Sequence, residues 1–391
     1  SNGYRKKILV LPIPLSIYVH FPWCISKCPY CDFNSHTLRE ALPERQYLDV
    51  LRRDIDSVTC LAGGRQVQSV FMGGGTPSLF SPDGIGEIIS FISGRVALAK
   101  DVEITLEANP ATVDLTKFSD FHAVGVNRLS IGVQSFDPKA LAALGRTHSC
   151  AEALNSIEVA HKAGFANFNV DLMFGIPGQN QATAVDDITM LLELEVPHVS
   201  HYQLTMEPNT RFYRFPPVCP SVDETWEMQE ACASRLIDAG FERYEVSAWS
   251  HTGHRCQHNV NYWQFGDYLG IGAGAHGKVT SVDGRVFRTM RPKHPKQYLR
   301  FSEDMSPQKE VDGTSLAFEF VLNAFRLIEG FPIRLFSERT YLDIETIGLP
   351  LRKASNGGLI DIENGWIKPT ELGYRFLDDL VELFLPVDAK R

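Results

Sequence analysis

The 391-residue sequence lacks any apolar run long enough to form a membrane-spanning helix. Its early apolar stretch, residues 8–15, is interrupted by Pro12 and Pro14, and no small-residue cleavage site follows it. These features argue against a secretory signal peptide. We therefore expect a cytoplasmic chain without a membrane span, for which peripheral contact with a membrane surface stays open.

The sequence also lacks an excess of basic residues. Lys and Arg number 38, against 47 for Asp and Glu, so the formal net charge is −9. A protein that binds nucleic acid without sequence specificity usually carries a positive patch or stripe. The charge balance therefore disfavours nucleic acid as a partner.

The eight cysteines lack the paired spacing of a disulfide framework, which indicates a reduced, intracellular chain. Three of them lie together, in the segment Cys24-Ile25-Ser26-Lys27-Cys28-Pro29-Tyr30-Cys31. Three thiolates at this spacing can bind three irons of a [4Fe-4S] cluster and leave the fourth iron open to a small molecule. A zinc knuckle and a disulfide loop are the alternatives. Zinc needs a fourth ligand, and neither Asp32 nor His36 repeats a ligand pair elsewhere.

Hydrophobic periodicity predicts alternating strands and helices around this segment. The predicted strands cover residues 16–23, 67–72, 102–108, 128–133, 167–174 and 198–205, and the predicted helices cover residues 45–59, 84–92, 114–123, 151–163 and 184–194. Six strands in this order favour an α/β fold with a parallel sheet, either open or closed into a partial barrel. In such folds the loops that follow the strands gather functional residues on one face.

A shift in composition divides the rest of the chain. Residues 1–280 hold the motifs and predict one large core. Residues 281–313 are polar, basic and interrupted by prolines, which predicts a linker. Residues 314–391 predict a smaller winged-helix-like α+β domain with a hairpin at 359–369 and a closing helix at 370–384. Its many acidic residues do not suit a DNA-recognition helix.

Polar and glycine-rich segments follow several predicted strands. Gly73-Gly74-Gly75-Thr76 comes after the second strand, and because glycine has no Cβ we expect the N–H groups of this turn to face a cofactor. Glu107, Gln134, Arg146 and Asp171 stand at or near later strand ends. Carboxylate and amide oxygens can accept hydrogen bonds from ribose hydroxyls, and an arginine can pair with a carboxylate.

The cysteine spacing, with Tyr30 before the last cysteine, and the glycine segment resemble the signature of radical S-adenosylmethionine (SAM) enzymes. Across nearly the whole chain the sequence is similar to the oxygen-independent coproporphyrinogen III oxidase-like family, and within it to the haem-chaperone branch. The resemblance implies a partial (β/α)6 radical SAM barrel with a [4Fe-4S] cluster, SAM and haem as cofactors. It also implies transfer of haem to acceptor proteins, respiratory ones among them.

The same resemblance implies which residues bind the cofactors. The cluster ligands would be Cys24, Cys28 and Cys31. The SAM pocket would contain Tyr18, Gly74, Gly75, Thr76, Glu107, Gln134, Arg146 and Asp171, with Tyr30 and Gln203 added from the family pattern. The glycine-rich segment 270–277 also matches a loop of the family, which we expect near the cofactor.

A second group of candidate ligands precedes residue 264. His251, His254 and Cys256 lead into His258-Asn259-Val260-Asn261-Tyr262-Trp263. A neutral imidazole is a common axial ligand of haem iron, and aromatic side chains supply flat apolar surface. The segment resembles the H-N-x-x-Y-W motif of the haem-chaperone branch, which predicts haem binding with His258 as axial ligand and Cys256 as runner-up. A polar loop and a zinc site remain alternatives for this segment. Four basic residues nearby could pair with haem propionates or belong to a solvated linker: Arg288, Arg291, Lys293 and Lys296.

Two departures from the dehydrogenases of the family bear on activity. Those enzymes carry a further cysteine two positions after the third cluster ligand, where this chain has Phe33, and a longer segment than the 23 residues before Cys24. We therefore expect no useful coproporphyrinogen III dehydrogenase activity. A radical SAM enzyme acting on coproporphyrinogen III or another tetrapyrrole is the alternative function. A winged-helix nucleic-acid protein with an iron-sulfur sensor is a third, which the acidic balance disfavours.

Overall fold

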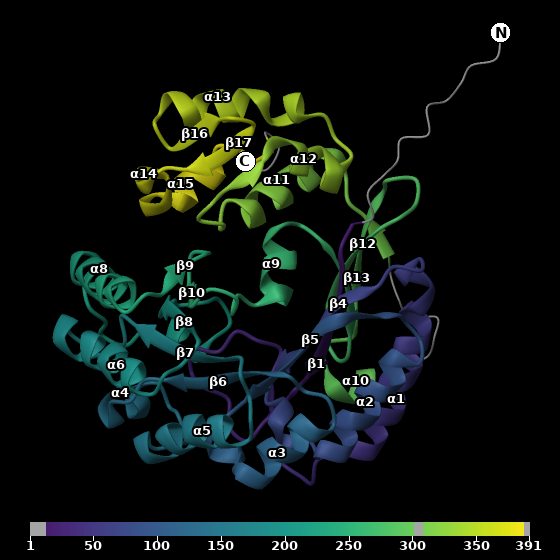
Figure 1. Ribbon diagram of the computed structural model, residues 1–391, viewed down its shortest axis with the longest axis vertical. Helices are drawn as coiled ribbons and strands as arrows, with labels where there is room; N and C mark the ends of the chain where they lie inside the picture. The colour runs from purple at the N-terminus through teal and green to yellow at the C-terminus, as the bar shows by residue number, and fades with distance from the viewer. Residues whose placement is uncertain (1–12, 301–307, 387–391) are drawn as a thin grey trace.

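A curved sheet forms the centre of the molecule (Figure 1). The computed structural model describes residues 13–300 and 308–386, so residues 8–12 of the N-terminal apolar stretch lie outside the described part. The sheet has the strand order β14-β13-β12-β11-β1-β4-β5-β6-β7-β8-β10-β9. Among the described residues, no helix combines the length and the apolar character that a bilayer crossing requires.

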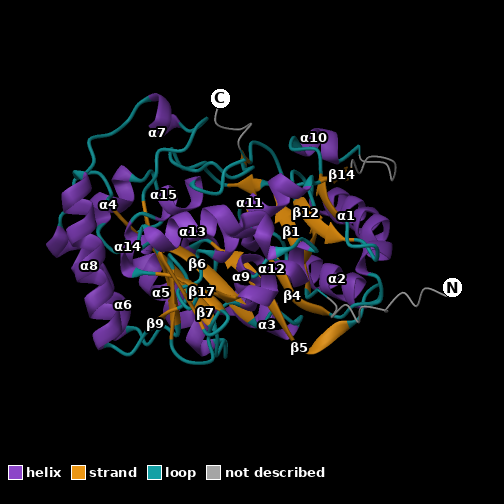
Figure 2. Ribbon diagram, turned by 90° about the horizontal axis from the view of Figure 1, so that it is seen from above, coloured by secondary structure: helices purple, strands orange, loops and turns teal. Residues whose placement is uncertain are grey.

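The middle of the sheet consists of the six predicted parallel strands. They are β1 (Leu15–Phe21), β4 (Val67–Gly74), β5 (Leu98–Ala108), β6 (Arg128–Gln134), β7 (Phe168–Phe174) and β8 (His198–Gln203). The connecting helices α1 (Glu44–Val58), α2 (Pro82–Ser93), α3 (Leu115–Ala123), α4 (Pro138–Ala143), α5 (Cys150–Lys162) and α6 (Gln181–Glu193) lie on the outer, convex face (Figures 1 and 2). This order confirms the predicted α/β fold.

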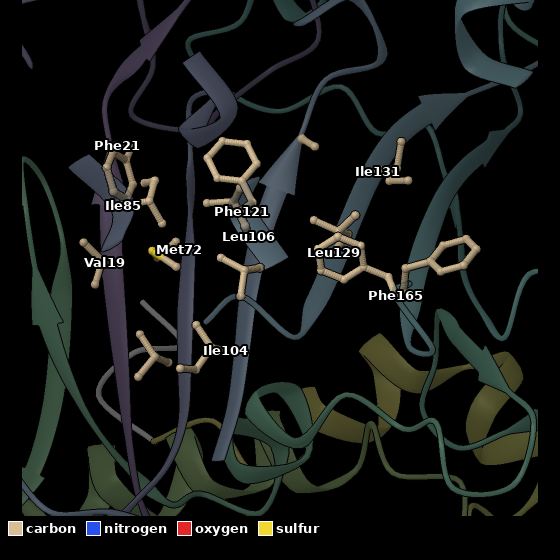
Figure 3. Close-up of a cluster of buried hydrophobic side chains, with 14 of the residues drawn as sticks. Val19, Phe21, Met72, Ile85, Ile104, Leu106, Phe121, Leu129, Ile131 and Phe165 are labelled. Atoms are coloured by element: carbon tan, nitrogen blue, oxygen red, sulfur yellow. The ribbon is translucent and has the colours of Figure 1, made fainter. Parts of the chain in front are cut away.

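The alternation of side chains along each strand gives the sheet an apolar outer face and a polar inner face. In β6, Leu129 and Ile131 belong to the outer core, whereas Arg128 and Ser130 line an interior cavity. Figure 3 shows the outer layer, where strand residues such as Leu129 group with Phe121 of α3. Burial of each large apolar side chain stabilises the fold by about 1.5–3 kcal/mol. The helices are thus held on the outside, and the inner face is left free for polar residues.

Short strands extend the sheet at both edges. On one side, β11 (Asp267–Ile271) runs parallel to β1, and β12 (His276–Thr280), β13 (Val286–Met290) and β14 (Gln308–Glu310) follow it in antiparallel order. On the other side are β10 (Ala248–Ser250) and β9 (Glu242–Arg243). The range predicted as a linker, 281–313, therefore holds β13, helix α10 (Pro295–Tyr298) and β14. Pro292 follows β13, Pro295 is the first residue of α10, and the domain division itself stays a prediction.

The histidine-rich segment contains a helix that the sequence analysis does not predict, α9 (Gln257–Trp263). Its first N–H groups are bound by Glu103 of β5, whose carboxylate accepts from the N–H groups of Gln257 at 2.9 Å and His258 at 3.1 Å. A carboxylate is the favoured partner of a helix N-terminus. This contact fixes α9, and with it His258, against the barrel.

The C-terminal residues form a separate hydrophobic cluster. It is built from α11 (Gly313–Ala324), α12 (Ile333–Thr340), α13 (Gly348–Asn356), α14 (Glu371–Arg375), α15 (Leu377–Glu382) and a small sheet of β15 (Phe331–Pro332), β17 (Trp366–Pro369) and β16 (Ile360–Glu363). The predicted hairpin is present, but the single closing helix is divided at Phe376. The module faces α9 and the end of the barrel (Figure 1). Arg326 joins the two parts through an ion pair with Glu245 at 3.0 Å.

Candidate functional site

One cavity of about 1040 Å³ runs along the inner face of the sheet. The three clustered cysteines line it, and so does His258 of α9. The two groups of candidate ligands, separated by more than 200 residues in the sequence, therefore border the same space. Of the other predicted residues, the cavity wall includes Tyr18, Tyr30, Gly74, Gly75, Thr76, Glu107, Gln134, Arg146 and Asp171.

The cysteine segment is a closed loop. The ribbon of β2 (Trp23–Cys24) and β3 (His36–Thr37) joins its ends, and the N–H of Cys31 donates to the carbonyl of Cys28 at 3.1 Å. Inside the loop, Lys27 Nζ donates to the carbonyl of Phe33 at 3.1 Å. All three thiols are free and partly exposed to the cavity. Three unpaired thiols on one wall fit the donor set of a [4Fe-4S] cluster with one open iron.

Two of these thiols are affected by burial, and the other lies beside an arginine. Burial raises the pKa of Cys24 and of Cys31. Arg146 places a positive charge beside Cys28. Its Nη1 donates to Sγ of Cys28 at 3.6 Å, and its Nη2 donates to the carbonyl of Gly132 at 2.6 Å. Arg146 therefore sits beside the cysteines in this structure, as well as in the predicted SAM pocket.

The glycine turn has a different role from the one predicted. The expectation that its N–H groups face a cofactor is wrong for this structure: the N–H of Gly74 donates to Glu107 at 2.9 Å, and that of Gly75 to the carbonyl of Phe21 at 2.6 Å. The glycines are needed for close packing instead. A Cβ on Gly74, which has φ +107°, would lie 2.3 Å from the ring of His20. Absence of a side chain lets the turn pass close to the ring of His20 while it lines the cavity.

Two carboxylates occupy the inner face. Burial, and next the charge of Asp171, raise the pKa of Glu107 to about 8. Burial also raises the pKa of Asp171 to about 6, although Asn169 donates to its Oδ1 at 2.7 Å. Both ionised carboxylates would be stabilised by a positive ligand. The wall between β5 and β7 is thus suited to a cationic group or to hydroxyl donors.

Strand β8 brings to the cavity a residue that was not predicted and leaves out one that was. Tyr202 lines the cavity, and its hydroxyl donates to Oε1 of Gln134 at 2.7 Å. Gln134 has φ +71°, a conformation uncommon outside glycine, which turns its side chain inward. Gln203 is exposed and is not among the cavity residues, because adjacent side chains of a strand point to opposite faces. The structure therefore brings Tyr202 to the site in place of Gln203.

A short hydrogen-bonded chain connects the first strand to the cysteine loop, and sequence reasoning missed it. Nε2 of His20 lies 2.8 Å from the carbonyl of Asn34, so it carries the proton, and Nδ1 accepts from the hydroxyl of Tyr18 at 3.0 Å. Burial lowers the pKa of His20 to about 4, which keeps the ring neutral. The Asn34 amide in turn donates to the carbonyl of Ala273, in the glycine-rich loop expected near the cofactor, at 2.9 Å. The period-two spacing of Tyr18 and His20 is a sequence signal that could have found this residue.

The imidazole of His258 is held through one nitrogen. Ser69 donates its hydroxyl hydrogen to Ser16 at 2.8 Å, so its oxygen accepts from Nδ1 of His258 at 3.0 Å. The ring packs against Phe71, with centroids 5.0 Å apart. Burial lowers the pKa of His258 to about 3. The ring is therefore neutral, and within the described residues its Nε2 has no hydrogen-bond partner.

Cys256, the predicted runner-up, lies away from the cavity. Its side chain is buried, and Sγ donates to Glu103 at 3.5 Å. Burial raises the pKa of this thiol to about 12, which disfavours the thiolate that binds metals. Because His258 and Cys256 point to different partners, Ser69 and Glu103, the structure does not bring them together as zinc ligands.

Two of the basic residues considered as propionate partners, Arg291 and Arg288, are engaged elsewhere. Arg291 is buried and forms an ion pair with Asp54 at 2.7 Å. Arg288 binds Glu319 and donates to the hydroxyl of Tyr268 at 2.7 Å. Lys293 borders the cavity and is exposed. The arginines of β13 and its end therefore hold the fold together.

Comparison with known proteins adds family evidence to this geometry. Residues 18–191 match the Radical SAM superfamily, and residues 311–376 match the HemN C-terminal domain. The Escherichia coli K12 protein named heme chaperone HemW is 46% identical over 373 residues, which cover 95% of this chain and 98% of that protein. The Haemophilus influenzae protein of the same name is 42% identical over 377 residues, with 95% and 98% coverage.

A solved structure shows the same fold. Coproporphyrinogen III oxidase (HemN) from Escherichia coli, described as a radical SAM enzyme, superimposes with a TM-score of 0.80. It is 21% identical, and the match covers 95% of this chain and 90% of that one. A likeness at this identity establishes the radical SAM fold, with the six parallel strands and the smaller C-terminal module, and leaves the chemistry to the residues of the site.

Proposed function

Since the chain belongs to the HemW family within the radical SAM superfamily, we propose that it is a haem chaperone, which binds haem beside a [4Fe-4S] cluster and SAM and passes the haem to an acceptor protein. The relatives from Escherichia coli and Haemophilus influenzae are both named heme chaperone, and the match covers 98% of each of them. The acceptor would be a haem protein, for instance a respiratory one. The eight free cysteines support a reducing compartment, the cytoplasm.

The superfamily implies a [4Fe-4S] cluster and SAM. Cys24, Cys28 and Cys31 would hold the cluster, which when bound offers one open iron to the amino and carboxylate groups of SAM. Glu107 and Asp171 support this proposal, because two buried carboxylates favour a ligand with positive sulfonium and amino groups. Around them, Tyr18, Tyr30, Gly74, Gly75, Thr76, Gln134 and Arg146 would complete the pocket.

The observation that carries the haem proposal is the tautomer of His258. A histidine that binds a metal usually donates its other ring N–H to a fixed acceptor, and the acceptor here is Ser69. The remaining lone pair, on Nε2, is unused, and the neutral ring is the form that binds iron. Tyr262 and Trp263, which also line the cavity, would supply apolar surface for the macrocycle.

The proposal is tested by binding and transfer together. Anaerobically reconstituted protein is titrated with haemin, and the Soret band is followed. The haem-loaded protein is then mixed with an apo b-type cytochrome, with haem-loaded albumin as the control donor. We expect a saturable Soret spectrum, and transfer faster than from albumin. Absence of binding, or transfer no faster than from albumin, would contradict the proposal.

The same preparation tests the enzyme alternative. Coproporphyrinogen III is offered with SAM and a reductant under anaerobic conditions, and protoporphyrinogen IX is measured. We expect no sustained turnover, because radical chemistry depends on a protein that positions the substrate against its cofactor. Multiple turnovers would favour the radical SAM enzyme over the chaperone.

A further inference from the structure

The interior of the barrel contains a cation whose donors are not used. Arg128, the first residue of β6, is 2% exposed, and its Nε and Nη2 atoms are buried without a hydrogen-bond partner in the described part of the chain. Leaving a buried charge without hydrogen bonds is costly, and folded proteins contain few such groups. The side chain therefore suggests a partner from outside the chain.

The two nearby carboxylates do not satisfy Arg128. Oε2 of Glu103 lies 3.9 Å from Nε, beyond hydrogen-bond distance. Both oxygens of Glu103 already accept hydrogen bonds, from the first N–H groups of α9. Asp171 accepts from Asn169 at 2.7 Å. The guanidinium is thus held in an acidic surrounding while its donors stay free.

Arg128 faces the same cavity as His258. It lines the main cavity and also borders a second one of about 360 Å³ at the opposite end of the strands. Glu103 is close to both residues, since it is 3.9 Å from Arg128 and accepts from the backbone N–H of His258 at 3.1 Å. Both residues line the one cavity, so a ligand that fills it is within reach of both.

We propose that Arg128 binds a carboxylate of the tetrapyrrole whose iron is bound by His258. This inference rests on the proposed function. A guanidinium presents two parallel donors to a carboxylate, and haem carries two propionates at its edge. The other arginines of the cavity are already bound, Arg146 to the carbonyl of Gly132 at 2.6 Å and Arg326 to Glu245 at 3.0 Å.

The experiment compares haemin with haemin dimethyl ester, which has the same iron and ring but no free carboxylates. Both are titrated into the wild-type protein, Arg128→Gln, Arg128→Lys and the control Arg255→Gln. Arg255 borders the second cavity only and forms an ion pair with Glu329 at 2.6 Å. We expect Arg128→Gln to bind haemin roughly tenfold more weakly, as for the loss of one charge-assisted hydrogen bond, with the ester affinity unchanged. Arg128→Lys should recover part of the loss, and Arg255→Gln should match the wild type.

Thermal unfolding of the ligand-free proteins separates this role from a structural one. Removal of an unsatisfied buried charge should leave the melting temperature of Arg128→Gln unchanged or higher, whereas loss of a structural ion pair with Glu103 would lower it. If the wild type binds haemin and its ester with equal affinity, the inference about Arg128 is overturned without use of any variant. The proposed function still stands in that case, provided that the haemin titration saturates. If the wild type binds neither compound, both proposals fall.

Discussion

The backbone N–H of Gly74 donates to Oε2 of Glu107 at 2.9 Å, and this is a hydrogen bond to a carboxyl group whose pKa burial raises to about 8. The unfolded chain would ionise this group near its ordinary value of 4.5. Between these two values the folded state keeps a proton that the unfolded state has lost. The free energy of unfolding therefore falls as pH rises through this window, and the loss is complete above about 8.

This linkage predicts a stabilising substitution. Glu107→Gln can still accept the hydrogen bond of Gly74 but does not titrate, so the ligand-free variant should be more stable than the wild type at pH 8.5 by roughly 2–5 kcal/mol. Near pH 4.5 the two should be equally stable. Urea unfolding at both pH values measures the difference. A wild-type stability that rises from pH 5 to 8 relative to the variant would contradict the assignment.

The cluster assignment predicts a selective loss of iron and sulfide. Replacement of Cys24, Cys28 or Cys31 by Ser should remove most of both after anaerobic reconstitution, since a cubane held by three thiolates does not persist on two. The matched control is Cys60→Ser, because Cys60 is also free but is exposed and lies outside the cavity. A full cluster in the three loop variants, or its loss in the control, would exclude this ligand set.

The close approach of the glycine turn predicts a strong effect of a single methyl group. A Cβ at Gly75 would lie 2.5 Å from the carbonyl oxygen of Trp23, which is backbone and cannot rotate away. We expect Gly75→Ala to lose about 1–3 kcal/mol of unfolding free energy. In the control Gly94→Ala, the nearest contact is an ordinary 3.4 Å, and the change should be neutral or stabilising by about 0.4–1 kcal/mol. Chemical denaturation of both variants tests this, and equal stabilities would contradict it.

The hydrogen bond between Ser69 and His258 predicts an indirect effect on haem. Ser69 does not itself line the cavity, so Ser69→Ala removes the acceptor of Nδ1 and leaves every lining residue in place. Haem affinity should therefore fall about tenfold while the Soret maximum stays unchanged. Ser57→Ala is a suitable control, because Ser57 lies on α1 and its hydroxyl donates to the carbonyl of Asp54 within the same helix. An unchanged affinity of Ser69→Ala would show that this serine does not orient the ligand.

The fold could be predicted from the sequence because the six strands are long and regularly separated by amphipathic helices. The short elements could not: β13 is five residues between polar turns, and α9 is helical because Glu103, about 150 residues earlier in the chain, binds its first N–H groups. Such a contact leaves no local signal. The antiparallel strands β12, β13 and β14 at one edge of the sheet are likewise not predicted from the sequence.

The candidate site was predicted in parts. Local spacing revealed the cysteines and the glycines, but hydrogen bonding decided what the glycine N–H groups face. Gln203, added from the family pattern, lies outside the cavity, whereas its neighbour Tyr202 lines it, because adjacent side chains of a strand point to opposite faces. Arg128 carried a signal that was overlooked, since Arg128, Ser130 and Gln134 fall on one face of an alternating strand. Nothing local in the sequence indicates that His258 and the cysteines share a cavity, because only the tertiary fold brings them together.

The central claim is that haem binds through His258 in the cavity that the cysteine loop also lines. The most direct measurement is a haemin titration of the reconstituted wild type and of His258→Ala, followed by Soret absorption, with His254→Ala as a control from the same segment that does not line the cavity. The account predicts that His258→Ala loses the wild-type Soret maximum and most of the affinity, and that His254→Ala keeps both. A His258→Ala variant with the wild-type spectrum and affinity would contradict it.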